Sequence, residues 1–275
     1  MEILITMKKI ILLLTLSFYT TQSISSETLT FGIVPQQSAS KLAKLWTPII
    51  ENINNRTGLS IKFATAKNIP SFEERLAKGE YDFAYMNPYH FTVYNQKPGY
   101  HAIAKASNKS IKGILVTKKN SPIKNLQDLE NSTIAFPAPA AFAATILTQA
   151  DLLKSQVNFS SKYVSSHDSV YRSVAKGIYS AGGGVVRTFK NVDPKINEQL
   201  NILWTTKGYT PHAISYHPNI SENIALKIQQ VLVEMANSKE GKKLLRNIKI
   251  SGFEKAVDSD WDDVRQLNIR LINPQ

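Results

Sequence analysis

Short apolar runs alternate with helical patterns along most of the chain, and this alternation limits the folds open to it. A buried-strand pattern at 29–34 leads into a pattern with helical spacing that ends at Gly58, where a left-handed cap suits glycine. Strand patterns return at 60–64 and 81–86, and the helix expected between them opens with a capping box at 71–74. Such repetition predicts parallel sheets with helices on both faces.

The alternation then begins a second time, which predicts two lobes. Strand patterns at 100–106 and 112–118 are joined by a polar turn. The expected elements after them are a helical turn at 121–129, strands at 133–136, 162–165, 181–186, 200–205 and 213–216, helices at 140–153 and 168–175, and two closing helices, the second at 239–245.

We expect one lobe over residues 26–111 together with 213–275, and the other over 112–212. A lobe inserted in this way requires two crossings of the chain, which would form a hinge. Ligands of open α/β sheets bind beyond the carboxyl ends of the strands, so both lobes are expected to face one ligand cleft.

The N-terminus predicts export. Met7-Lys8-Lys9 is a positive stretch, 10–19 is a short apolar run, and Ser23-Ile24-Ser25 fits a cleavage site, so residues 1–25 are interpreted as a signal peptide. The alternative, a membrane anchor, needs about 20 apolar residues. With no cysteine in the chain, a disulfide framework, a cysteine nucleophile and a thiolate metal site are excluded. We expect a periplasmic monomer.

The formal net charge of +12 comes from scattered lysines and arginines. It is either an ordinary solvated surface or a field that steers an anionic ligand to the protein. Because an exported protein seldom meets nucleic acid, and the chain has no long basic block, we expect no nucleic-acid partner.

Four stretches carry a resemblance to a known family. They are 31–35, a strand ending in proline; 76–89, with Asn87 where glycine is usual; 121–129 followed by 133–136; and 165–170, which contains Ser166-His167-Asp168. In this order the chain resembles the periplasmic phosphonate/phosphite-binding proteins of ABC transporters, a branch of the type II periplasmic binding fold. The resemblance spans nearly the whole exported chain and implies a two-lobed α/β receptor with two hinge crossings.

Several candidate ligand-binding residues follow the predicted strands. The segment after 81–86 offers Tyr85, Asn87, Tyr89 and His90, whose rings and amide can stack on a ligand or form hydrogen bonds to it. Tyr85 and Tyr89 can equally be core residues. Gln36 follows the first strand, and Tyr209 lies where the chain returns across the hinge.

The resemblance directs attention to three further parts of the chain. It implies an anion site at the helix after Phe136, where the backbone N–H groups near Ala141 and Phe142 would bind the ligand. It also implies ligand contact by His167, for which a helix-capping role is the alternative. The acid often present near 181–186 in this family is absent, and Arg187 follows instead, as a candidate for binding a carboxylate or phosphonate.

The function predicted is capture of a small, anionic, phosphonate-like ligand for a membrane permease of an ABC transporter. Two alternatives stay open: a sensor that signals to a membrane kinase or cyclase, and a binder of a quaternary amine or carboxylate, which the aromatic residues of the cleft would suit. No enzyme motif is present, and the five histidines lack metal-binding spacing. We therefore expect no catalysis, no metal and no cofactor.

Overall fold

The chain builds two separate β-sheets, and the computed structural model describes residues 28–272. The first sheet has six strands in the order β11-β4-β10-β3-β1-β2. These are β1 (Leu29–Ile33), β2 (Ile61–Ala64), β3 (Phe83–Met86), β4 (His101–Ala106), β10 (Ala213–Tyr216) and β11 (Phe253–Lys255). The second sheet has five, in the order β7-β6-β8-β5-β9. These are β5 (Gly113–Lys118), β6 (Ser132–Phe136), β7 (Phe159–Tyr163), β8 (Ala181–Val185) and β9 (Leu200–Thr205).

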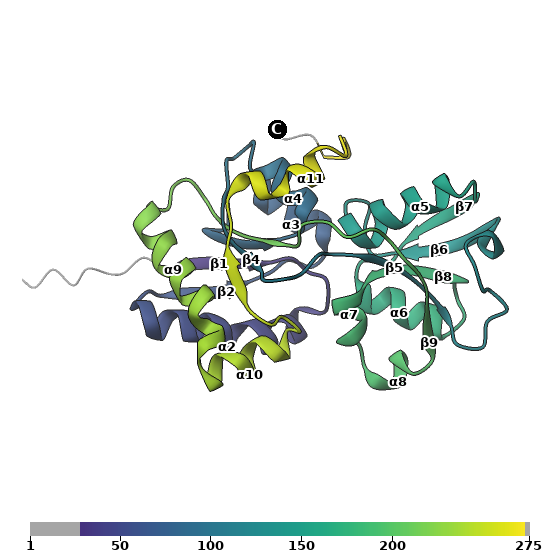
Figure 1. Ribbon diagram of the computed structural model, residues 1–275, viewed down its shortest axis with the longest axis horizontal. Helices are drawn as coiled ribbons and strands as arrows, with labels where there is room; N and C mark the ends of the chain where they lie inside the picture. Colours follow the sequence, from purple (N-terminus) through teal and green to yellow (C-terminus); the bar gives the residue numbers. More distant parts are fainter. Residues whose placement is uncertain (1–27, 273–275) are drawn as a thin grey trace, which may run out of the picture.

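Helices flank each sheet, so the molecule has two α/β lobes as predicted (Figure 1). The first lobe contains α2 (Ala39–Thr57), α3 (Ile69–Ala77), α4 (Pro88–Tyr94), α9 (Glu222–Glu234), η3 (Met235–Asn237), α10 (Lys239–Asn247), η4 (Asp258–Trp261) and α11 (Asp262–Arg265). The second contains η1 (Gln127–Leu129), η2 (Phe142–Leu147), α5 (Thr148–Lys154), α6 (His167–Ala175), α7 (Val186–Lys190) and α8 (Pro194–Asn197).

Two crossings join the lobes, one over 107–112 and the other over 206–212. They run side by side, because Ile111 and Tyr209 exchange backbone hydrogen bonds of 2.7 and 3.0 Å. Both predicted domain limits, 111/112 and 212/213, fall at these crossings, and we keep them as a proposal. The paired crossings make a short ribbon between the two lobes.

The expectation of parallel sheets is wrong for the strands next to the crossings. Strands β1, β2 and β3 are parallel, as are β6, β7 and β8, whereas β10 runs antiparallel to β3 and β4, and β5 runs antiparallel to β8 and β9. The reason is the end of each sheet at which the chain enters the lobe. β10 and β5 begin at the crossings, beside the points where β3 and β8 end, and no helix carries the chain back first.

Two helix starts also differ from the sequence analysis. Helix α3 begins at Ile69, and its cap is Asn68, whose Oδ1 accepts from the Ser71 N–H at 2.9 Å; Ser71 itself is not the cap. Helix α4 is not expected from the sequence, which predicts strands at 81–86 and 100–106 with no helix between them. Asn87 Oδ1 accepts from the His90 N–H at 2.8 Å, and proline at the first helical position needs no N–H partner.

The end and the buried face of helix α2 are as the sequence predicts. Gly58 has φ 73° and closes α2 as its left-handed cap. The buried face of α2 consists of Leu42, Trp46, Ile49, Ile50 and Ile53, as its spacing predicted. Trp46 packs between Phe31 of β1 and Tyr85 of β3, with ring centroids 6.2 and 4.6 Å away.

Two glycines bring the start of η2 directly onto the second sheet. A methyl group on Gly113 of β5 would collide with the Ala143 carbonyl oxygen, and one on Gly183 of β8 with the Ala144 carbonyl oxygen. The backbone of the first helical turn therefore packs on the strands with no side chain between them. This contact fixes the direction in which the start of η2 faces.

We predict that Gly183→Ala lowers the free energy of unfolding by about 1–3 kcal/mol, the usual cost of overpacking, because the Ala144 carbonyl must move. Gly252→Ala is the matched control: its methyl would meet only the Ser107 hydroxyl, at 3.0 Å, and Ala236. Urea unfolding of both variants measures the difference. Equal stability of the two variants would contradict the close packing of η2.

Candidate functional site

A small enclosed space lies between the lobes, where the carboxyl ends of several strands meet. Gln36 after β1 and Asn87 after β3 approach it from the first lobe. Residues 141–144 at the start of η2 and His167 at the start of α6 approach it from the second. Its volume is about 10 Å³, room for about one water molecule. The lobes are therefore closed over the site.

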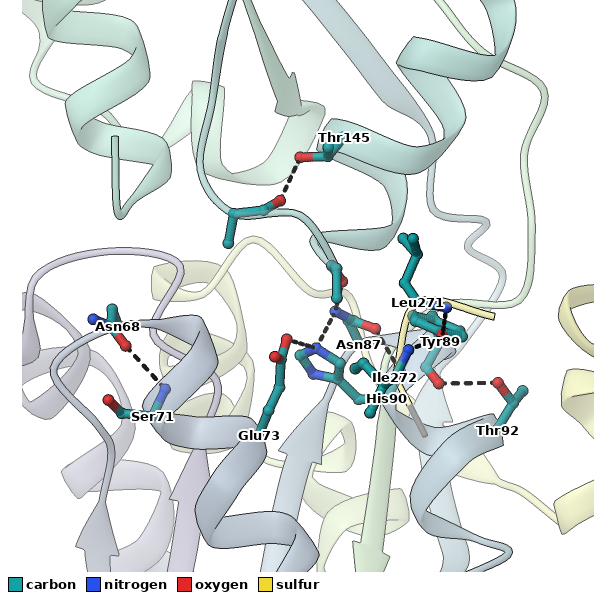
Figure 2. Close-up of polar contacts among 12 residues, drawn as sticks. Asn68, Ser71, Glu73, Asn87, Tyr89, His90, Thr92, Thr145, Leu271 and Ile272 are labelled. Atoms are coloured by element: carbon teal, nitrogen blue, oxygen red, sulfur yellow. Dashed lines mark hydrogen bonds and ion pairs between the residues drawn. The ribbon is translucent and has the colours of Figure 1, made fainter. Parts of the chain in front are cut away.

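Hydrogen bonds between the lobes hold this closed arrangement. Asn87 Nδ2 donates to the Ala140 carbonyl at 3.0 Å, and the His167 N–H donates to the Gln36 carbonyl at 3.0 Å. Figure 2 shows the Asn87 amide reaching upward from α4 to the segment that leads into η2. Arg187 of α7 also donates to Gln36 Oε1. Opening the lobes would break these bonds.

The start of η2 presents backbone donors to the enclosed space. The N–H groups of Phe142, Ala143 and Ala144 have no hydrogen-bond acceptor among residues 28–272, and the same residues line the space. A helix start combines such free donors with the positive end of the helix dipole. The Thr145 hydroxyl donates to the Ala138 carbonyl at 2.8 Å, so it is already occupied (Figure 2).

His167 faces these donors as a neutral side chain. Its ring Nδ1 lies 3.2 Å from the Thr188 hydroxyl, which fixes the orientation of the ring. Burial, together with the positive charge of Arg187, lowers the pKa of His167 to about 3. At neutral pH the imidazole therefore carries one proton, which it can donate in a hydrogen bond.

His212 also lines the space. It belongs to the stretch 209–212 expected at the cleft, from which only Tyr209 was chosen as a candidate. Its ring stacks on Tyr85, with centroids 4.8 Å apart and planes 16° from parallel. Burial and the charge of Arg187 lower the pKa of His212 well below its ordinary value. Its Nε2 is buried and has no partner within the described residues, which makes it available to a ligand. The sequence signal was its place at the end of the second crossing.

His90 lies behind the site rather than in it. It is fully buried, and its Nε2 is 3.0 Å from Asn87 Nδ2 and 2.9 Å from Glu73 Oε1 (Figure 2). A ring nitrogen can form only one of these two bonds: a protonated Nε2 donates to the Glu73 carboxylate, because Asn87 Nδ2 is itself a donor. Glu73, which was not a candidate from the sequence, thus holds the ring, and His90 positions the Asn87 amide through its backbone N–H, which donates to Asn87 Oδ1 at 2.8 Å.

The remaining selected residues lie beside the space or away from it. Tyr85 and Arg187 are adjacent, with the guanidinium carbon 5.6 Å from the centre of the Tyr85 ring. Tyr209 packs edge-on against Phe142, with centroids 5.7 Å apart. Tyr89 contacts the C-terminal segment instead, where its hydroxyl accepts from the N–H groups of Leu271 and Ile272, both at 2.8 Å (Figure 2).

The arrangement is suited to binding an anion without a metal. Backbone donors and neutral imidazoles line the space, and no acidic side chain does so. Among residues 28–272, no group of three histidine or acidic side chains is placed to hold a metal ion. Within the same residues, no helix is both long and apolar enough to cross a membrane.

Comparisons with known proteins agree with this architecture. Residues 31–261 match the family described as the periplasmic substrate-binding protein of the phosphonate ABC transporter. The chain is 23% identical to the phosphonates-binding periplasmic protein of Escherichia coli, over 87% of this chain and 75% of the relative. It is 20% identical to the phosphate-import protein PhnD of Mycolicibacterium smegmatis, over 88% of this chain and 85% of the relative.

A solved structure shares the fold. PhnD1 of Prochlorococcus marinus, in complex with methylphosphonate, superposes with a TM-score of 0.78 at 19% identity, covering 88% of this chain and 99% of that one. This confirms the two-lobed type II periplasmic binding fold expected from the sequence. The match spans nearly all of the described residues, so the chain belongs to the family of periplasmic substrate-binding proteins of phosphonate ABC transporters.

Proposed function

We propose that this protein captures a small phosphorus oxyanion, namely a phosphonate, phosphite or phosphate, between its lobes and presents it to the membrane permease of an ABC transporter. The observation that carries the proposal is the set of free N–H groups at Phe142, Ala143 and Ala144, which face a closed space that no acid lines. Relatives named for phosphonate binding and phosphate import support the ligand class.

Neutral donors are suited to this task. The N–H groups of η2 would bind two or three oxygens of the anion, and the imidazoles of His167 and His212 would donate to the others. No hydroxyl side chain occurs between Phe136 and Thr145. The ligand would then depend on the backbone and the imidazoles rather than on serine and threonine.

Ligand entry requires the lobes to open about the paired crossings, because the closed space holds about one water molecule. The Asn87–Ala140 and His167–Gln36 bonds would break on opening and form again around the ligand. An anion that contacts both lobes stabilises the closed form, since only differential contacts shift such an equilibrium. The closed form is what a permease would recognise.

The quaternary-amine alternative has less support from the site. An aromatic cage needs several ring faces, yet Phe142 contributes the only aromatic ring among the residues that line the space within 28–272, apart from the two histidines. The buried Tyr171 hydroxyl donates to the Val185 carbonyl within the second lobe and does not line the space. The sensor alternative differs only in the membrane partner, a kinase or cyclase in place of a permease. Transport and sensing would both use closure of the lobes around the ligand. We propose a periplasmic monomer in either case.

The ligand class is tested by thermal unfolding of the exported chain with phosphonates, phosphite, phosphate, carboxylates and quaternary amines. A ligand at 100 times its Kd should add about 2.7 kcal/mol of stability. We expect this with a phosphorus oxyanion. Stabilisation by an amine or carboxylate alone would contradict the proposed ligand.

We predict that His167→Ala weakens phosphonate binding at least tenfold, because hydrogen bonds to charged groups contribute about 1.5–3 kcal/mol. His101→Ala is the matched control, since His101 is half exposed and lies on β4 outside the cleft. Isothermal titration calorimetry measures both variants. An unchanged Kd in His167→Ala would remove His167 from the site.

The low pKa of His167 also predicts a dependence of stability on pH. The unfolded chain takes up this proton as the pH falls below about 6.5, whereas the folded chain does so only near pH 3. The free energy of unfolding should therefore decrease as the pH falls from 6.5 toward 3, and His167→Gln should flatten this decrease. Urea unfolding at several pH values tests it, with His101→Gln as control. A variant profile parallel to that of the native chain would contradict the buried neutral imidazole.

A further inference from the structure

A second, larger cavity adjoins the small space between the lobes. Its volume is about 630 Å³, within the range of small-molecule pockets, and it shares Ile111, Val185 and His212 with the small space. Helix α7 of the second lobe and the turn between α10 and β11 of the first lobe form its two sides. Figure 1 shows this turn beside α7, close to the crossings. We call this cavity the vestibule.

The vestibule is strongly and uniformly basic. Six of its lining side chains are cationic and none is acidic: Lys109, Lys112, Arg187, Lys190, Arg246 and Lys249. None of the six forms an ion pair with a carboxylate of residues 28–272. Like charges gathered without counter-charges repel one another and raise the local potential for anions.

These cations come from three parts of the chain. The first crossing contributes Lys109 and Lys112, and α7 contributes Arg187 and Lys190. Arg246 comes from the end of α10, and Lys249 from the turn after it. An anion in the vestibule would therefore contact both lobes and the hinge at once. Such contacts would form fully only when the lobes close.

Arg187 stands where the two spaces meet. Its guanidinium lines the vestibule and donates to Gln36, which lines the small space. Ile111, Val185 and Ile250 give the vestibule an apolar floor that would suit a short hydrocarbon chain. One ligand can thus extend from the start of η2, past Arg187, to the lysines.

We infer that the ligand is an organophosphonate or phosphate ester that carries a second anionic group, such as a carboxylate or another phosphoryl group, bound in the vestibule. This inference rests on the proposed function, because the first phosphorus group is taken to occupy the small space. A ligand with an ammonium group is disfavoured, since the six cations would repel it and no acid is present to pair with it.

Calorimetry with three phosphonates tests the inference. The probes are methylphosphonate, 3-phosphonopropionate and 2-aminoethylphosphonate, each titrated in about 0.15 M salt to screen distant charges. The vestibule variant is Lys109→Gln/Arg246→Gln/Lys249→Gln. The control variant, Lys62→Gln/Lys78→Gln/Lys227→Gln, removes the same charge from exposed positions that do not line the vestibule.

We expect the native chain and the control to bind 3-phosphonopropionate at least tenfold more tightly than methylphosphonate, a difference of about 1.4 kcal/mol, and 2-aminoethylphosphonate most weakly. In the vestibule variant this preference should fall to within about twofold, while the Kd for methylphosphonate stays unchanged. Binding of methylphosphonate without any preference, or a preference that survives in the vestibule variant, would overturn the inference alone. If the native chain binds phosphite or phosphate but none of the three phosphonates, the inference alone is overturned; failure to bind phosphite and phosphate as well would overturn the proposed function.

Discussion

The contact between the backbone of η2 and the second sheet is the constraint on which the site depends. Gly113 and Gly183 leave no side chain between the strands and the first turn of the helix, so the carbonyls of Ala143 and Ala144 pack on the sheet. The free N–H groups of this turn consequently face the first lobe. A single methyl group in this contact would tilt the donors and alter the cleft without touching a ligand.

Closure then completes the site from the opposite side. The paired crossings carry His212 beside Tyr85, and Asn87, held by His90, meets the segment before η2. Buried neutral imidazoles and backbone amides make a small set of donors, whereas four lysines and two arginines line the adjoining vestibule. In the binding mode that we propose, the small space holds the phosphorus group of the ligand. The vestibule holds its second anionic group.

Much of this architecture is predictable from the sequence, because strand and helix periods are local. The face of α2, its Gly58 cap and the division into two alternating runs followed from spacing alone. The direction of the strands near the crossings could not be predicted in this way, since it depends on where the chain enters each lobe. His212 was missed and Tyr89 was selected for a related reason: each side chain is placed by a distant partner, Tyr85 in one case and the C-terminal segment in the other. The residues adjacent in sequence to His212 or Tyr89 do not indicate which distant residue each side chain contacts.

The most direct test of the account is the response of individual backbone amides to ligand. In ¹H–¹⁵N spectra of residues 26–275 titrated with methylphosphonate, the amide protons of Phe142, Ala143 and Ala144 should move downfield, as expected for N–H groups that donate to an anion, and by more than those of residues outside the cleft. Saturable binding that leaves these three resonances in place would contradict the central claim that the start of η2 binds the ligand.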